Sequence, residues 1–343
     1  MPYDIAADPR LDPRLKALLA AMPSEPAADV ANRDELLAQM NTPEALARRT
    51  AMDAMLDAID NDDVAPSAGL RIVEDQAISQ PDGNTINLRI IRPDTDDVLP
   101  CVYYIHGGGM ASLSADRGMY RAWGKIIAAN GVVVVMVDFR NCVTPSSVPE
   151  VAPFPAGLND CVSGLEWTVA NAARFGIDTT HLVVAGESGG GNLTLATGLQ
   201  LKRDGKLGLI TGLYVLCPYI AGSWPQDDLP SSTRNNGILL DLHSNIGAVG
   251  YGIEAFEARD PLAWPLFASE DDLRGLPRTV ISVNECDPLC DEGVVFYRRL
   301  LAAGVAARGR MVLGTMHGTE IFAIACPEIS RDTARDLAAF AAG

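Results

Sequence analysis

The sequence lacks the features of a membrane-spanning or secreted protein. Its longest purely apolar run near a predicted strand, Val132–Val137, is far shorter than the ~20 residues that a transmembrane helix requires. Residues 1–20 contain Pro2, Pro9 and Pro13 and several charges, without a basic segment followed by an apolar one, so no signal peptide is expected. These absences predict a cytoplasmic protein with no stable membrane insertion.

Cysteine and histidine pairs with metal-binding spacing are also absent. The seven cysteines form no CxxC motif and are odd in number, and several lie in apolar surroundings, such as Cys101, Cys161 and Cys217. Reduced, buried thiols in a cytosolic protein are therefore expected. Because no Cys or His pair has zinc-finger spacing, no metal site is predicted.

Basic residues are few relative to acidic ones. The 343 residues include 27 Lys and Arg against 44 Asp and Glu, which gives a net charge of −17. An acidic surface repels phosphate backbones, so nucleic acid is not expected as a partner. Hydrophobic residues make up 48% and charged residues 21%, close to the average of soluble globular proteins, so the chain can bury a large core.

Apolar periodicity divides the chain into an α/β core and two further parts. Residues 1–65 have helical spacing and are predicted to form N-terminal cap helices. Residues 66–219 open with a β-hairpin and then alternate strands with helices, and this alternation resumes in 271–343. Residues 220–270, rich in Pro, Trp, Asn and Asp, interrupt it as a cap insertion. The pattern predicts a mostly parallel eight-stranded sheet flanked by helices.

A G-x-S-x-G motif stands between a predicted strand and a predicted helix. Gly186–Gly190 follows the apolar strand Leu182–Ala185 and precedes a helix over Asn192–Arg203, with Ser188 at its centre. A nucleophilic serine on such a sharp turn has strained backbone angles, and its neighbours need to lack Cβ so that the turn can pack closely. A plain glycine-rich turn is the alternative, but the strand–turn–helix context favours a catalytic nucleophile.

A second glycine-rich stretch, His106–Gly109, follows the predicted strand Val102–Ile105. Backbone N–H groups of glycines can approach a developing oxyanion closely. The N–H groups of Gly108, Gly109 and Gly189 are therefore predicted to form the oxyanion hole. A nucleotide-binding loop is disfavoured because the stretch has neither a lysine nor GxGxxG spacing.

The catalytic base is predicted by elimination among four histidines, which are His106, His181, His243 and His317. The first belongs to the glycine loop, the second opens the strand before the elbow, and the third lies in the insertion. His317 lies in a loop between the last strand and the last helix, where a Ser…Asp…His chain order places the base.

The third member of the triad is predicted to be Asp287. It follows the strand Arg278–Val283, at the carboxyl edge where parallel sheets place their sites, and would orient the histidine. Glu285 and Asp291 are the rival carboxylates, and an Asp-Pro turn is the structural alternative.

Several further motifs resemble those of the hormone-sensitive-lipase-like (bacterial family IV) esterases, and the resemblance extends from about the hairpin to the C-terminus. The matching stretches are HGGG at 106–109, DFR at 138–140, PFPAG at 153–157, the elbow at 186–190, DPL at 287–289 and HG at 317–318. The resemblance implies the α/β-hydrolase fold, the same triad and oxyanion hole, a cap over the site and short- to medium-chain acyl substrates. It also implies a homodimer, because family members often pair through the sheet edge near the last strand.

The substrate pocket is the least determined part of the site. The sequence departs from the family at Glu187 and Gly189 in the elbow, at Thr319 after the histidine and at Met110 beside the oxyanion loop. Cap aromatic residues can line an apolar ester pocket or form the core of the cap equally well. The substrate-binding candidates are Met110, Glu187, Tyr219, Trp264 and Thr319.

Together the motifs predict a carboxylesterase that acts on a small-molecule ester through an acyl-enzyme, with no cofactor. Two alternatives stay open: a non-enzymatic small-molecule-binding protein on the same fold, and a hydrolase of another bond type, namely a lactonase, an amidase or a lipase.

Overall fold

The computed structural model of the protein describes residues 4–21 and 26–343. The strands are β1 (Leu70–Ile78), β2 (Thr85–Pro93), β3 (Leu99–Ile105), β4 (Val133–Asp138), β5 (Ile177–Glu187), β6 (Gly212–Leu216), β7 (Arg278–Asn284) and β8 (Ala307–Val312). The helices are α1 (Pro13–Ala21), α2 (Arg33–Met40), α3 (Pro43–Asp57), α4 (Gly118–Ala128), α5 (Ala156–Ala170), α6 (Ala172–Phe175), α7 (Gly189–Arg203), α8 (Ser231–Arg234), α9 (Ile246–Glu257), α10 (Glu270–Leu273), α11 (Cys290–Ala302) and α12 (Pro327–Ala342).

The eight strands form one sheet in the order β1-β2-β4-β3-β5-β6-β7-β8. Strand β2 runs antiparallel to both β1 and β4, and all other neighbours are parallel. Parallel neighbours need crossover connections, and these are the helices that the sequence alternation predicted. The predicted fold, a mostly parallel eight-stranded sheet flanked by helices, is confirmed.

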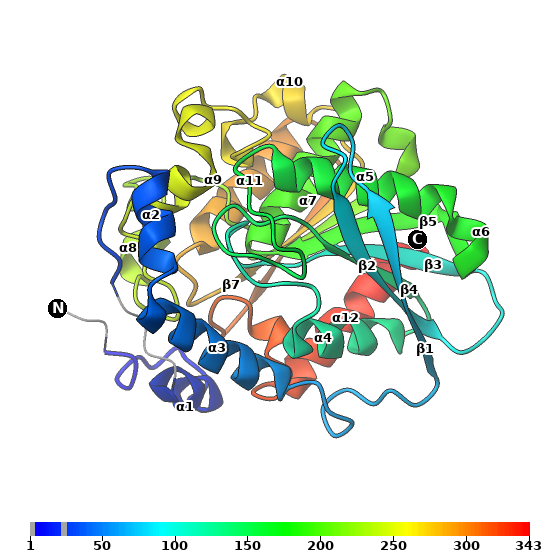
Figure 1. Ribbon diagram of the computed structural model, residues 1–343, viewed down its shortest axis with the longest axis horizontal. Helices are drawn as coiled ribbons and strands as arrows, with labels where there is room; N and C mark the ends of the chain where they lie inside the picture. Colours follow the sequence, from blue (N-terminus) through cyan, green and yellow to red (C-terminus); the bar gives the residue numbers. More distant parts are fainter. Residues whose placement is uncertain (1–3, 22–25) are drawn as a thin grey trace.

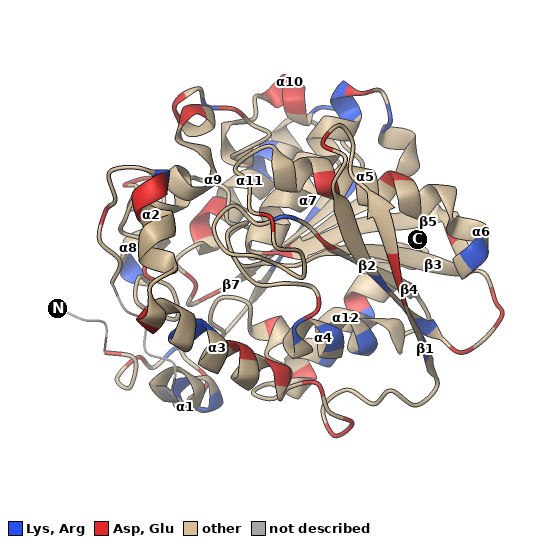
Figure 2. Ribbon diagram, viewed as in Figure 1, with Lys and Arg blue, Asp and Glu red and all other residues tan. Residues whose placement is uncertain are grey.

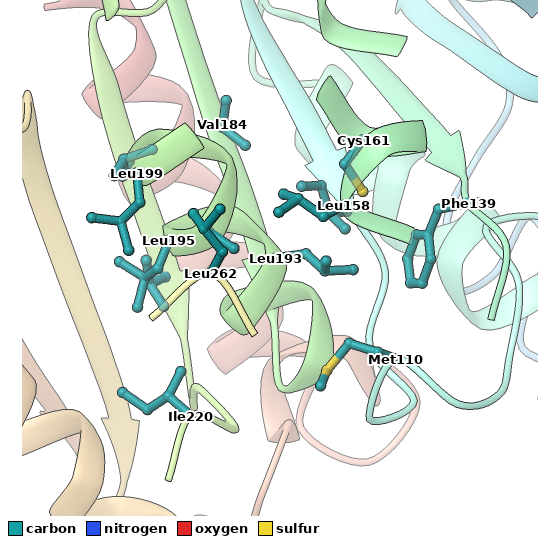
Figure 3. Packing of buried hydrophobic residues seen from close by; sticks show 14 of the residues in the cluster. Met110, Phe139, Leu158, Cys161, Val184, Leu193, Leu195, Leu199, Ile220 and Leu262 are labelled. Atoms are coloured by element: carbon teal, nitrogen blue, oxygen red, sulfur yellow. The ribbon is translucent and has the colours of Figure 1, made fainter. Parts of the chain in front are cut away.

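Strand β4 shows how the sheet separates two cores. Val133, Val135 and Val137 belong to one buried cluster, whereas Val134 and Met136 belong to the other. Successive side chains of a strand point to opposite faces, so an uninterrupted apolar run is what a strand covered on both sides needs. Figure 3 shows part of the first cluster, where Leu193 of α7 lies toward Leu158 of α5 and Leu195 lies on the other side of α7, toward Leu262.

Helices cover both faces of the sheet. Helices α5, α7 and α11 pack on one face, and α4 and α12 pack on the other. The N-terminal helices α2 and α3 lie at the side of the molecule where α8 and α9 of the β6–β7 connection are found (Figure 1), and α2 contacts α9. This side adjoins the carboxyl ends of the parallel strands, where ligand sites of such sheets lie.

Two element boundaries at the predicted nucleophile differ from the sequence prediction. Strand β5 extends to Glu187, beyond the predicted Ala185, and α7 begins at Gly189 and not at Asn192. The strand and the helix therefore meet at Ser188 with no intervening loop, which makes the turn at the predicted nucleophile as tight as two elements allow.

The surface carries the acidic excess. Figure 2, where Asp and Glu positions are red, shows them on several elements, among them α2 and α10, with Lys and Arg positions interspersed elsewhere. In the part of the chain that the structure describes, no helix combines the length and apolar character needed to span a bilayer.

Candidate active site

Ser188 occupies the strained turn that its motif predicted. Its backbone angles are φ 56° and ψ −119°, a region that L-residues rarely adopt and that recurs at functional sites. The turn is held at the main chain, because the Ser188 N–H donates to the carbonyl of Leu216 over 3.0 Å. Its own carbonyl accepts from the N–H groups of Asn192 (3.0 Å) and Tyr219 (3.1 Å). The side chain is partly exposed at the start of α7.

The glycine loop after β3 lies against this turn. Gly108 and Gly109 have φ values of 91° and 63°, which glycine adopts without steric cost. A Cβ on Gly189 would lie 2.7 Å from the Gly109 nitrogen, so the three predicted oxyanion donors are neighbours in space. Within the described residues, the N–H groups of Gly108 and Gly109 donate to no other protein group. They are therefore available to an oxygen of a bound substrate.

The Glu187 carboxylate joins the glycine loop to the nucleophile turn. Oε1 accepts from the Gly107 N–H at 2.7 Å and from the Tyr120 hydroxyl at 2.5 Å, and Oε2 accepts from the Tyr104 hydroxyl at 2.5 Å. Burial raises the pKa of Glu187, and the two tyrosine hydrogen bonds and nearby His106 oppose that rise. With three protein donors, this carboxylate has a structural task in the loop in addition to its place at the cavity wall.

His106, the first residue of the same glycine stretch, packs against Phe139 and Asp138. Its ring stacks on Phe139 with centroids 4.2 Å apart, and its Nε2 lies 3.5 Å from Oδ1 of Asp138. Both His106 and Asp138 are buried. This environment accords with a structural role for His106 and leaves His317 as the histidine at the cavity.

His317 and Asp287 form a buried hydrogen-bonded pair, with 2.7 Å between Nδ1 and Oδ2. Asp287 follows β7 in a loop closed by the hydrogen bond from the Leu289 N–H to its Oδ1 (2.9 Å). The rival carboxylates are engaged elsewhere, because Glu285 accepts from the Gly314 N–H and Asp291 accepts from the Ser231 N–H. Since Nδ1 faces the aspartate, Nε2 is the ring nitrogen that can take a proton from a nucleophile.

The surroundings of His317 favour its protonated form. Burial alone would lower the pKa of His317, but the charge of Asp287 and the contact with Cys217 oppose burial and hold that pKa well above its usual value of 6.5. The Cys217 thiol is itself buried, and its pKa is raised to about 11. Asp287 thus stabilises the imidazolium that an acyl-transfer cycle creates.

Ser188, His317, Gly108 and Gly109 all line one apolar cavity, whose volume is about 550 Å³. The Ser188 hydroxyl and His317 form no hydrogen bond in this state of the described chain. Such bonds are often long in unliganded enzymes and tighten when substrate binds.

Most of the remaining wall of the cavity is apolar, a lining that suits an uncharged acyl or alkyl group. The apolar side chains come from α3, from the loop after the glycine stretch, from the start of α4, from the β6–β7 connection and from the segment after His317. These lining residues are Met52, Leu56, Leu113, Met119, Leu239, Leu240, Leu242, Ile321 and Phe322.

Of the five substrate-binding candidates, two line the cavity and three lie elsewhere. Glu187 and Tyr219 line the cavity, whereas Met110, Trp264 and Thr319 do not. Met110 points into the core between the sheet and α7 (Figure 3). Trp264 is fully buried behind Tyr219, with ring centroids 5.5 Å apart. The Thr319 hydroxyl is buried in its own turn, where it donates to the Met316 carbonyl over 2.8 Å.

Sequence reasoning missed the aliphatic residues that the cavity uses and favoured aromatic ones. The available signal was the run Leu239, Leu240 and Leu242, which follows the polar stretch 230–237. Aromatic side chains of the insertion pack instead on one another, as with Tyr251 against Trp264, whose ring centroids lie 5.6 Å apart. Large rings bury the most area in a cap core, which leaves smaller side chains to face the cavity.

One group of side chains in the described chain has ligand atoms close enough for a metal ion. Cys217, Asp287 and His317 each offer one such atom, within 4.8 Å of one another. The His317 and Asp287 atoms of this group are already joined by their 2.7 Å hydrogen bond. The arrangement can therefore act as a proton-transfer pair without a metal.

Comparisons with known proteins agree with this geometry. A family model described as the α/β-hydrolase fold matches residues 102–321. Carboxylesterase NlhH of Mycobacterium tuberculosis is 32% identical over 271 residues, which cover 78% of this chain and 81% of that protein.

Two solved structures cover nearly the whole chain. Esterase Est22 superposes with a TM-score of 0.98 at 62% identity, covering 99% of this chain and all of that one. Brefeldin A esterase, described as a bacterial homologue of human hormone-sensitive lipase, superposes with a TM-score of 0.85 at 38% identity, covering 98% of this chain and 94% of that one. This chain belongs to the α/β-hydrolase-fold family, among its hormone-sensitive-lipase-like esterases, and is a carboxylic ester hydrolase.

Proposed function

We propose that this enzyme hydrolyses small, uncharged esters with short to medium acyl chains, using Ser188 as nucleophile, His317 as base and Asp287 as the orienting acid. One observation carries the proposal: Ser188, His317 and two unengaged loop N–H groups open on the same largely apolar cavity. Among the residues that the structure describes, no Lys or Arg lines this cavity, so an anionic substrate would find no counter-charge from them.

The geometry supports a two-step acyl transfer. The Ser188 hydroxyl oxygen attacks the ester carbonyl carbon while Nε2 of His317 takes its proton. The carbonyl oxygen becomes an oxyanion, held by the N–H groups of Gly108, Gly109 and Gly189. The imidazolium then gives its proton to the departing alkoxide, which leaves as alcohol.

Water completes the cycle. His317 takes a proton from a water molecule as its oxygen attacks the acyl carbon, and the collapse of the second oxyanion returns the proton to Ser188 and releases the acid. Rates measured on an amide, a lactone and a long-chain lipid, beside those on small esters, test whether the site prefers esters.

The decisive experiment measures hydrolysis of p-nitrophenyl esters from acetyl to palmitoyl by the wild type and by Ser188→Ala. We expect a maximum at short to medium chains and a loss of kcat on the order of 10⁴-fold or more in the variant. Full activity in Ser188→Ala would overturn the mechanism. A folded wild type without esterase activity that also resists fluorophosphonate labelling would favour the ligand-binding alternative.

We also infer that residues 1–65 and 220–270 act as a cap over the 66–219 and 271–343 core. The proposal rests on cavity residues from both segments, such as Met52 and Leu56 in α3 and Leu240 in the β6–β7 connection. Replacing Leu240 with Trp, which reduces the cavity from the cap side, should shift the acyl-chain optimum to shorter esters and leave acetate hydrolysis intact.

A homodimer in the cytoplasm is the state that the surface and the thiols favour. Strand β8 is an edge of the sheet, and Met311 and Leu313 are 47% and 71% exposed there, a combination typical of an interface. The seven cysteines are all free and buried, as in proteins of reducing compartments. Sedimentation of the wild type against Met311→Glu tests the dimer, since an interfacial charge should produce monomers.

A further inference from the structure

The loop that carries Asp287 is held by the β6–β7 connection, and its contacts come from helix α8 and the residue that follows it. Asn235 is fully buried, and its Nδ2 donates to the carbonyls of Glu285 (3.1 Å) and Asp287 (2.9 Å). One amide thus fixes the main chain at the proposed catalytic acid and two residues before it. The Asn235 N–H donates to the carbonyl of Ser231 (2.9 Å), which sets the orientation of the asparagine.

Ser231 holds the other side of the same loop. Its hydroxyl donates to the carbonyl of Pro288 (3.0 Å) and accepts from the N–H of Asp291 (2.9 Å). The Ser231 N–H donates to Oδ2 of Asp291 (2.6 Å). The carbonyls of residues 285, 287 and 288 therefore all accept hydrogen bonds from two side chains of a single helical turn.

The contact continues to the N-terminal segment. Oδ1 of Asn235 accepts from Nη1 of Arg10 (3.0 Å), and the N–H of Asp12 donates to the carbonyl of Gly314 (2.9 Å) in the loop of His317. Figure 1 shows α1 and α8 on the same side of the molecule. The acid loop and the histidine loop are also joined directly, by the bond from the Cys286 N–H to the Thr315 carbonyl (2.9 Å).

We propose that Asn235, assisted by Ser231, is a positioning residue that sets the distance and direction of the Asp287 carboxylate toward His317, with Arg10 fixing Asn235 in turn. The inference rests on the proposed role of Asp287 as the orienting acid. A buried main-chain carbonyl that loses its hydrogen-bond donor costs free energy, so the loop would shift to find other donors. The Asp287 side chain would shift with its main chain.

The consequence is a coupling between cap and catalysis. The β6–β7 connection supplies both cavity wall residues, such as Leu240, and the two side chains that hold the acid loop. The placement of Asp287 and part of the cavity wall therefore depend on the same connection.

The test compares Asn235→Ala with Asn245→Ala. Asn245 is a matched control because its side chain also joins the N-terminal segment to the β6–β7 connection, through the N–H and carbonyl of Val30 (2.9 and 2.8 Å), without touching the acid loop. Rates are measured with p-nitrophenyl butyrate and divided by the concentration of active sites that react with a fluorophosphonate.

Asn235→Ala is expected to lower kcat by about ten- to a hundred-fold, because a displacement of about 1 Å at a catalytic group can cost on the order of 10²-fold. KM should stay within about threefold, since no cavity contact is removed. The acidic limb of the kcat/KM profile should move to lower pH, because a displaced Asp287 stabilises the imidazolium of His317 less. Asn245→Ala should leave kcat and the acidic limb unchanged.

An Asn235→Ala enzyme with a lowered melting temperature but wild-type kcat and pH profile would overturn the proposal, because the asparagine would then only stabilise the fold. If Asn235→Ala does not accumulate as folded protein, Arg10→Gln and Ser231→Ala take its place, with smaller losses of kcat in the same direction. Asp287→Asn is measured in parallel. Wild-type kcat in that variant refutes the proposed triad itself, whereas a slow Asp287→Asn beside a normal Asn235→Ala refutes only the positioning role.

Discussion

The Glu187 carboxylate and the Gly107 N–H, 2.7 Å apart, join the residue before the proposed nucleophile to the loop of the proposed oxyanion hole. The bond constrains the position of the Ser188 turn relative to the N–H groups proposed to receive the negative charge. Since oxyanion stabilisation depends on donors held in advance at the right place, this contact should matter for the rate although it does not touch the substrate's reacting carbon.

Glu187→Gln should therefore lower kcat. The amide nitrogen that replaces one carboxylate oxygen cannot accept from Gly107 or from a tyrosine hydroxyl, so the loop loses part of its support. Removing one oxyanion donor outright typically costs about 10²–10³-fold in kcat, and displacement of the loop should cost less than that. Steady-state kinetics on p-nitrophenyl butyrate checks this, with Glu150→Gln, at an exposed loop position, as control. A kcat equal to that of the wild type in Glu187→Gln would show that the loop holds its position without the carboxylate.

Gly189→Ala is expected to impair catalysis in this enzyme. A Cβ there would lie 2.5 Å from the nitrogen of Met110 and 2.7 Å from that of Gly109, distances at which the backbone of the oxyanion loop has to move. We expect a fall in kcat of about tenfold or more, by the same sensitivity to donor placement. Gly208→Ala, where an added Cβ meets no atom within 4 Å, serves as the control in the same assay. Unchanged kinetics in Gly189→Ala would mean that the loop yields without loss of alignment.

The pH profile of kcat/KM should fall on its acidic side at a pH well above 6.5. Only neutral His317 can take the proton of Ser188, and its neighbours hold the pKa of His317 well above the usual value, so activity is lost as pH drops through that raised pKa. Asp287→Asn removes the charge that raises it. The limb should then move to lower pH, and kcat should drop by about 10⁴-fold, as for loss of a triad aspartate elsewhere. A limb that stays in place in Asp287→Asn would assign it to another group.

The ionisation of Glu292 should make the free energy of unfolding depend on pH. Its carboxylate is buried and accepts from the N–H of Ile220 (2.5 Å) and from Nε1 of Trp224 (2.7 Å), yet burial prevails over these donors and raises its pKa from 4.5 to about 8. Between these two values the folded state retains a proton that the unfolded chain has released. Stability therefore decreases as pH rises across this window, by at most about 1.4 kcal/mol per pH unit from this group.

Urea unfolding of wild type and Glu292→Gln at pH 5, 6, 7 and 8 checks this prediction. The variant has no titrating group at this position, so its free energy of unfolding should fall less steeply over the range than that of the wild type. Glu257→Gln, at an exposed position of α9, should follow the wild-type slope. Parallel slopes for the wild type and Glu292→Gln would show that the carboxylate is ionised in the folded protein throughout.

Local patterns in the sequence were enough for the sheet and for the residues proposed to perform the chemistry. The valine run of β4 required apolar cover on both faces, and the glycines around Ser188 marked a turn that other residues cannot form. Four histidines in the chain made elimination effective. The fold prediction succeeded because pleat periodicity and positive φ angles are properties of neighbouring residues, and the choice of His317 stays a proposal.

The walls of the pocket could not be obtained in this way. Trp264 and Leu240 lie in the same inserted connection and are both apolar, yet one is buried behind Tyr219 and the other lines the cavity. Which apolar side chain faces the substrate depends on how the connection folds against α3 and the sheet. No period of two or 3.6 residues marks that choice in an irregular segment.

The sequence by itself determined the α/β order of elements, the strained serine turn and the glycine loop, and it pointed to His317 as the proposed base, since each depends on short-range sterics or on residue count. Only the tertiary structure decided that Glu187 would support the oxyanion loop, that Cys217 would lie beside His317, and that Asn235 would hold the main chain of Asp287 from 52 positions away. Such contacts arise where distant segments pack in a low-dielectric interior, because every buried donor and acceptor there must find a partner and the partner need not be near in the chain.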